Sequence, residues 1–118
     1  MADDVVIFHN PSCSKSRQTL GILVEHGVDP EVVLYKQAPP DRATLERIVT
    51  TIDLEPSKLV RRDPEFKEAG LTPADVETAD QVIEVLLAHP ALMERPVVVK
   101  GNQVVLGRPP ENVEALLA

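Results

Sequence analysis

The sequence predicts an α/β fold in which a central mixed β-sheet is flanked by helices. Three observations support this prediction: the chain opens with a strand, helix and strand pattern, continues with a helical stretch, and closes with a strand, strand and helix. Strands joined by a crossover helix are expected to be parallel with a right-handed connection, whereas a two-residue turn makes its strands antiparallel. The length of 118 residues fits one domain spanning 1–118.

The opening pattern begins with a short apolar run, residues 5–8, which predicts a strand covered on both faces. Asn10 and Pro11 then interrupt the run and open a loop. A helix is expected over residues 14–26, with Gly27 as its C-cap. A second strand follows at residues 32–35.

The middle of the chain is predicted to be mostly helical. Asp41 can cap a helix whose apolar residues recur at the helical spacing, namely Leu45, Ile48, Val49 and Ile52. Residues 57–62 lie between two prolines and fit one or two helical turns. Residues 63–75 are expected to form turns and short helix. Thr78 and Gln81 resemble a capping box for a helix that ends before Pro90.

The closing pattern contains two apolar runs, residues 97–100 and 103–106, separated by Gly101 and Asn102. A two-residue Gly-Asn turn between two apolar runs predicts a β-hairpin. After Pro110 the apolar residues again share one helical face, so a final helix is expected.

The one cysteine of the chain, Cys13, lies where the first strand gives way to the first helix. The unpaired N–H groups and the positive end of the dipole at a helix N-terminus stabilise a thiolate. No acidic residue lies between Val5 and Val24, while Lys15 and Arg17 closely follow the cysteine. These surroundings predict a reactive thiol and disfavour an inert core cysteine.

The number of thiols restricts what such a site can do. Dithiol exchange needs a second cysteine, commonly three residues after the first, and Ser16 occupies that position. An oxidised or adducted Cys13 therefore needs an external thiol, such as glutathione or a glutaredoxin, for its regeneration. A lone cysteine also excludes an internal disulfide, which favours a reducing, cytoplasmic location.

Composition argues against several other classes of function. The net charge of −7, with no Trp, one Tyr and two Phe, disfavours nucleic-acid binding. The acidic residues 1–4 fit neither a secretory signal nor a transit peptide, and no apolar stretch is long enough for a membrane helix. His9, His26 and His89 show no ligand pairing with the cysteine, so no metal site is expected.

Arginines next to prolines form a second pattern. Arg95 directly precedes Pro96, and Arg108 directly precedes Pro109, while Arg61 and Arg62 lie in the segment bracketed by prolines. Guanidinium groups are permanent, forked donors for tetrahedral oxyanions. Together with a thiolate they predict an oxyanion site. Pro96, at the start of a predicted strand, is a candidate cis-proline.

Four motifs in order now identify a resemblance along nearly the whole chain: residues 9–13 with Ser16 and Arg17, residues 59–62, residues 95–99, and Arg108 with Pro109. With them the chain resembles the glutaredoxin-coupled arsenate reductase family of the thioredoxin superfamily. The resemblance implies a thioredoxin-like fold and an oxidoreductase of arsenic resistance that reduces arsenate to arsenite.

The resemblance also implies roles for individual residues. It implies Cys13 as the nucleophile that forms a thiol–arsenate adduct, Arg61, Arg95 and Arg108 as oxyanion-binding residues, and His9, Ser16 and Arg17 as residues that tune the thiol. Glutathione would act as the external reductant and glutaredoxin as the protein partner, with no bound cofactor. The sequence leaves open whether Arg61 or Arg62 faces the site.

Two other interpretations stay open at this point. A monothiol oxidoreductase acting on glutathionylated or other small thiol substrates would use the same cysteine. A redox-related regulatory protein that binds RNA polymerase is also similar in sequence. Such regulators usually carry a pair of cysteines as the switch, and Ser16 removes that pair.

Overall fold

The computed structural model describes residues 5–117, so the prediction about the acidic residues 1–4 lies outside the described residues. The chain divides into two compact units. Within the described residues, the first unit comprises 5–38 and 95–117, and the second comprises 39–94. The prediction of a single domain stays a prediction.

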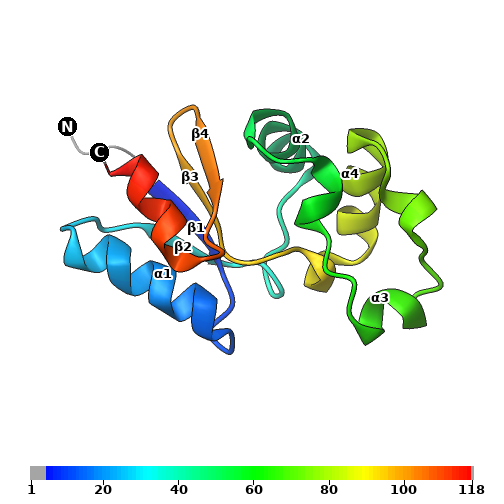
Figure 1. Ribbon diagram of the computed structural model, residues 1–118, viewed down its shortest axis with the longest axis horizontal. Coiled ribbons are helices and arrows are strands. Elements are labelled where there is room, and N and C mark those ends of the chain that lie inside the picture. The colour runs from blue at the N-terminus through cyan, green and yellow to red at the C-terminus, as the bar shows by residue number, and fades with distance from the viewer. Residues whose placement is uncertain (1–4, 118) are drawn as a thin grey trace. The chain divides into compact units, whose positions relative to one another are not determined.

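The first unit contains a four-stranded sheet in the order β2-β1-β3-β4 (Figure 1). Its strands are β1 (Val5–His9), β2 (Glu31–Leu34), β3 (Val97–Lys100) and β4 (Gln103–Leu106). β1 runs parallel to β2 and antiparallel to β3, and β3 and β4 form a hairpin. The predicted mixed sheet, with its parallel opening pair and antiparallel closing pair, is therefore confirmed.

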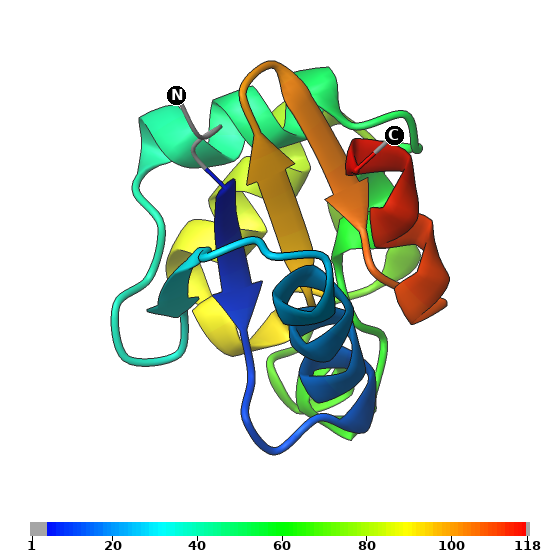
Figure 2. The same ribbon diagram turned by 90° about the vertical axis from the view of Figure 1, so that its left-hand side faces the viewer.

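Two helices, α1 (Ser14–Glu25) and the 3-10 helix η4 (Pro110–Leu116), pack together over the same face of this sheet (Figure 2). Together with the strands they bury one apolar cluster, formed by Val5, Ile7, Leu23, Val98, Val113 and Leu116. The last helix was expected from its apolar face. Because a 3-10 helix has about three residues per turn, Val113 and Leu116 lie one above the other and share the buried face.

The element boundaries differ slightly from those predicted. α1 ends at Glu25, and Gly27 then adopts a φ of 77°, a conformation that glycine reaches without steric cost. The second strand covers Glu31–Leu34 rather than 32–35, and Tyr35 follows it fully buried. Val32 is 43% exposed because β2 is an edge strand.

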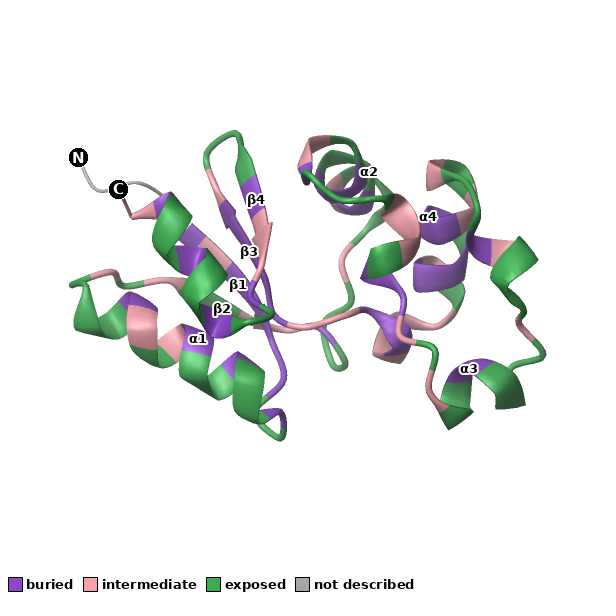
Figure 3. Cartoon of the chain, in the orientation of Figure 1, coloured by how far each residue is buried: buried purple, intermediate pink, exposed green. Residues whose placement is uncertain are grey.

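The second unit is helical, as predicted. It contains α2 (Arg42–Thr51), η1 (Pro56–Leu59), α3 (Pro64–Glu68), η2 (Pro73–Val76), α4 (Ala79–Ala88) and η3 (Pro90–Leu92). The Asp41 side chain caps α2 by accepting from the Thr44 N–H at 2.9 Å. Thr78 and Gln81 form the predicted capping box of α4. α2 and α4 pack on each other, and their buried residues form the interior of this unit (Figure 3).

Within residues 5–117, the structure contains no helix whose length and apolar character would suit it to crossing a membrane.

Candidate active site

The candidate site is built on the loop between β1 and α1, which the side chain of Asn10 shapes. The Asn10 side-chain oxygen accepts from the Ser12 N–H at 2.9 Å, and its backbone carbonyl accepts from the Cys13 N–H at 3.0 Å. These bonds turn the chain sharply after the strand. Cys13 then takes the N-cap position of α1 with an extended backbone, so its side chain lies beside the first N–H groups of the helix.

Cys13 is a free, buried thiol with a lowered pKa. Burial alone raises the pKa of Cys13, but three kinds of contact outweigh it. The backbone N–H of Ser16 has the largest lowering effect, followed by the hydrogen bond and the positive charge of Arg95, and then by the backbone N–H of Lys15. The helix N-terminus thus favours the thiolate, as the sequence predicted, but the positive charge beside the sulfur comes from Arg95, whereas the sequence assigned it to Lys15 and Arg17.

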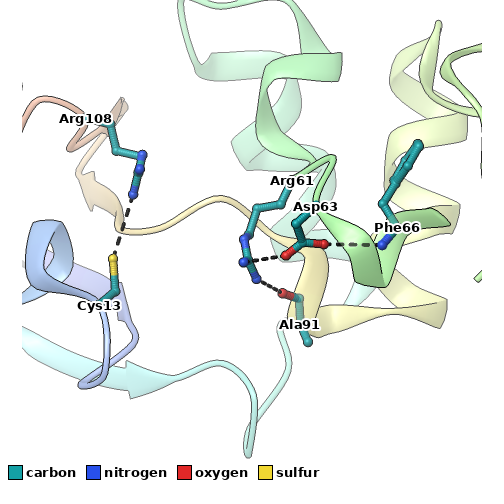
Figure 4. Close-up of polar contacts among 6 residues, drawn as sticks. All are labelled: Cys13, Arg61, Asp63, Phe66, Ala91 and Arg108. Atoms are coloured by element: carbon teal, nitrogen blue, oxygen red, sulfur yellow. Dashed lines mark hydrogen bonds and ion pairs between the residues drawn. The ribbon is translucent and has the colours of Figure 1, made fainter. Parts of the chain in front are cut away.

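Arg108 also reaches the thiol. Its Nη1 lies 3.7 Å from the Cys13 Sγ (Figure 4). The same nitrogen donates to the Arg95 carbonyl oxygen at 3.2 Å. The Arg108 backbone is held by Asn112, whose side-chain nitrogen donates to the Arg108 carbonyl at 3.2 Å. Two predicted arginines, one at each end of the β3–β4 hairpin, therefore contact the same sulfur atom.

Both arginines precede cis peptide bonds. The Arg95–Pro96 bond is cis, which confirms the candidate cis-proline, and the Arg108–Pro109 bond, for which no prediction was made, is cis as well. The Nε of Arg95 is buried and has no hydrogen-bond partner within residues 5–117. A buried donor without an acceptor is unfavourable, so an acceptor brought to this nitrogen would be stabilised.

His9 and Ser16 form a buried pair behind the thiol. The Ser16 Oγ lies 2.7 Å from the His9 Nδ1 and accepts from the Asn10 N–H at 3.0 Å. Burial, assisted by the charge of Arg17, lowers the pKa of His9, so its imidazole is neutral at pH 7. The Ser16 hydroxyl can donate its proton to the His9 Nδ1. In that arrangement the neutral imidazole carries its own proton on Nε2.

Arg17 shapes the loop from the first turn of α1. Its Nη1 donates to the Pro11 carbonyl at 2.9 Å, so the side chain folds back over the loop that carries the cysteine. Its charge acts on His9. Of the three predicted tuning residues, Ser16 thus acts on the thiol through its backbone, while the structure places Arg17 on the loop and beside the histidine.

Arg61 belongs to the second unit. Its guanidinium pairs with the Asp63 carboxylate and donates to the Ala91 carbonyl at 3.2 Å (Figure 4). Arg62 is exposed and lines an open groove of about 460 Å³ together with Lys58 and Glu94. The predicted contact of Arg61 or Arg62 with the oxyanion stays a prediction.

Two residues of the site were missed by the sequence reasoning, which named Asn10 only as a loop residue and did not name Asn112. An Asn before Pro is a recognisable turn signal, and the sequence indicated the loop at Asn10 on that ground, but it did not indicate the hydrogen bond with which the Asn10 side chain shapes this loop. Asn112 gives no such signal, because its contacts with the carbonyls of Leu106 and Arg108 depend on how η4 returns to the hairpin. Among residues 5–117, no group of three His, Cys, Asp or Glu side chains is arranged to hold a metal ion.

Comparison with known proteins places this arrangement in a family. The profile of the ArsC family matches residues 8–116. The chain is 42% identical to the uncharacterized protein YfgD of Escherichia coli, with 96% of each chain covered. It is 40% identical to an arsenate reductase of Neisseria meningitidis serogroup A, with 97% of this chain and 98% of the relative covered.

A solved structure gives the same result. The arsenate reductase from Vibrio cholerae superposes with a TM-score of 0.88 at 38% identity, and the match covers 98% of both chains. A family profile that covers residues 8–116, together with relatives of 40% identity or more over almost the full length, establishes membership. The chain therefore belongs to the ArsC family and has the thioredoxin-like fold of its arsenate reductase relatives.

Proposed function

We propose that this protein is an arsenate reductase of the glutathione- and glutaredoxin-coupled type. One observation carries the proposal: the Cys13 thiol, with its lowered pKa, lies at a helix N-terminus in contact with the guanidinium groups of Arg95 and Arg108. Relatives at 40% and 38% identity bear the name arsenate reductase, which identifies arsenate as the oxyanion to test first.

In the first step of the proposed reaction, the Cys13 thiolate attacks the arsenic atom of arsenate. A sulfur–arsenic bond forms, and one arsenate oxygen leaves as water after it is protonated. Because an anionic nucleophile repels an anionic substrate, nearby positive charge is needed. Arg95 and Arg108 supply it, and the buried Nε of Arg95 offers a donor to an incoming oxygen. Arg61 is proposed as a third oxyanion ligand.

In the second step, the thiolate of glutathione attacks the Cys13 sulfur of the adduct. A disulfide forms between Cys13 and glutathione, the sulfur–arsenic bond breaks, and its electron pair stays on arsenic, which becomes arsenite. Glutaredoxin then takes the glutathione through thiol–disulfide exchange and returns Cys13 as a thiolate. Ser16 cannot perform this exchange, because a hydroxyl does not resolve a disulfide.

His9, Ser16 and Arg17 are proposed as the residues that hold the loop carrying Cys13 and tune the ionisation of its thiol. The contacts of Ser16 with the Asn10 N–H, of Arg17 with the Pro11 carbonyl and of His9 with the Ser16 hydroxyl support this role. The match to the ArsC family over residues 8–116 supports the proposal that the whole chain acts as one reductase domain. A thiol-dependent reaction of this kind suits the reducing cytoplasm, with arsenic resistance as its biological outcome.

The test is a coupled assay that follows arsenite formation from arsenate by the purified protein with glutathione and glutaredoxin. We expect turnover by the wild type, loss of turnover in Cys13→Ser, and loss when either thiol component is omitted. Arsenite formation by Cys13→Ser at the wild-type rate would refute the mechanism. Release of glutathione from glutathionylated substrates, without arsenite formation, would instead identify the protein as a monothiol oxidoreductase.

A further inference from the structure

We propose that Thr19 and Gly107 are positioning residues whose direct contact, the Thr19–Gly107 contact, holds Arg108 against the Cys13 thiol. The inference rests on the proposed function only where arsenate is concerned. The placement of the Arg108 charge beside the thiolate can be measured without any arsenic chemistry.

The first argument is the space around Gly107. A Cβ atom at this position would lie 2.6 Å from the Thr19 Oγ1, 2.9 Å from the Pro96 Cγ and 3.0 Å from the Thr19 Cγ2. The glycines with positive φ are Gly27, Gly70 and Gly101, so the backbone conformation at Gly107 does not itself require glycine. Close approach of the chain to α1 is therefore the reason for a glycine here.

The second argument is the position of Thr19, which is fully buried on α1. Its hydroxyl lies 2.8 Å from the Lys15 carbonyl and 3.3 Å from the Gly107 carbonyl, so it shares its proton between the first turn of the helix and the hairpin end. The Gly107 N–H donates to the Pro96 carbonyl at 2.9 Å. Gly107 is thus fixed on both sides, by the helix that begins after Cys13 and by the start of β3.

Arg108 is the next residue, so the placement of its side chain follows from that of Gly107. Its carbonyl is held by Asn112, and its Nη1 reaches the Cys13 Sγ at 3.7 Å. An alanine at position 107 would place its Cβ less than 3.0 Å from side-chain atoms of Thr19 and Pro96, so something must shift. Because both of these side chains are buried, we expect the shift to fall on the chain at residue 107. A contact already at 3.7 Å weakens readily on such a displacement, because hydrogen bonds to a charged donor depend on distance and angle.

The charge at the thiol can be read from two alkylating reagents. Iodoacetate is anionic and iodoacetamide is neutral. The rate of the thiolate with iodoacetate divided by its rate with iodoacetamide, the rate ratio, therefore increases with nearby positive charge. Because the chain has one cysteine, the whole signal comes from Cys13. A unit charge about 6 Å from the reagent carboxylate in water changes this ratio roughly threefold. We expect a decrease of that size in Arg108→Ala, which calibrates the probe.

Gly107→Ala is expected to reduce the rate ratio by up to about twofold, less than Arg108→Ala does. The reason is that loss of the contact with Cys13 lets the Arg108 side chain extend to about 12 Å from the reagent, where its charge acts at about half its strength. The matched control is Gly21→Ala, which makes the same substitution at an exposed position of α1, where a Cβ meets nothing within 4 Å. This control should keep the wild-type ratio. A folded Gly107→Ala with the wild-type ratio would overturn the proposal.

The threonine is tested by two variants that keep most of its volume. Thr19→Val removes the hydroxyl bond to the Gly107 carbonyl and should reduce the rate ratio, whereas Thr19→Ser keeps the hydroxyl and should restore it. If circular dichroism shows that Gly107→Ala does not fold, the rate ratios of Thr19→Val and Thr19→Ser test the proposal instead. A folded Thr19→Val with the wild-type ratio, or a Thr19→Ser no better than Thr19→Val, contradicts the positioning role.

The steady-state assay gives a separate reading. We expect Gly107→Ala to raise the KM for arsenate several-fold, with a smaller change in kcat, because oxyanion binding loses an aligned donor. If the protein reduces no arsenate but the rate ratio falls as expected, the proposed function fails and the Thr19–Gly107 contact stands. If arsenate is reduced and the ratio is unchanged, only the positioning proposal fails.

Discussion

Replacing Arg108 with alanine should raise the pKa of Cys13 by an amount that the structure allows us to calculate. The guanidinium Nη1 lies 3.7 Å from the sulfur, on an exposed side chain, so the interaction is screened nearly as in water. At that distance and a dielectric constant of about 80, two unit charges interact by about 1.1 kcal/mol, which corresponds to about 0.8 pKa unit. Arg95→Ala should raise the pKa further, because Arg95 contributes both a hydrogen bond and its charge.

The assay is the pH dependence of alkylation of Cys13 by iodoacetamide, which reacts with the thiolate alone. A matched control is Lys100→Gln, which removes one positive charge from the end of β3 that pairs with Val5. Since β1 carries the chain about 3.3 Å per residue away from that pair, the charge lies roughly a Debye length or more from the thiol. A midpoint in Arg108→Ala within about 0.2 unit of the wild-type value would refute the electrostatic reasoning.

Three further predictions concern other parts of the chain. Ser16→Cys should let glutathionylated Cys13 release glutathione without glutaredoxin, as followed by mass spectrometry, because a thiol three residues along can resolve the disulfide; retention of the glutathione would contradict this. Leu23→Ala should lower the free energy of unfolding by about 3 kcal/mol in urea titrations, since Leu23 is fully buried in the apolar cluster; a loss below about 1 kcal/mol would contradict this. Asp41→Ala should destabilise the protein at neutral pH. The lowered pKa of Asp41, caused mainly by the Thr44 N–H, means that its contribution is present above the ordinary value of 3.8 and is lost as the pH falls through the lowered one. The stability difference between Asp41→Ala and wild type should therefore shrink in acid.

Much of the fold could be predicted because local patterns and turn chemistry agree with it. The hairpin at Gly101 and Asn102 and the caps at Asp41 and Thr78 are encoded within a few residues of where they act. The one-residue shift of β2 arises because its pairing with β1 sets its limits, and Tyr35 is buried without belonging to the strand.

The parts of the site that could be predicted are those whose chemistry depends on residues adjacent in the sequence. A cysteine before a helix and two arginines before prolines are visible in the sequence, and the fold brings them together. The contact between Thr19 and Gly107 joins residues 88 positions apart, so nothing near either of them predicts it. A glycine explained by packing looks the same in a sequence as one explained by a turn.

The two roles proposed for the guanidinium groups oppose each other. In the free protein, Arg95 stabilises the thiolate and so lowers the pKa of Cys13, while Arg108 contacts the same sulfur. A thiolate of low pKa is abundant at neutral pH but is a weaker nucleophile than one of higher pKa. In the proposed reaction the oxyanion would share the same donors, so the sulfur would lose part of its stabilisation at the moment when it attacks arsenic. Under the proposed mechanism, substrate binding would therefore raise the reactivity of a thiolate that the free site has already formed, which gives a reason for two arginines to contact one sulfur.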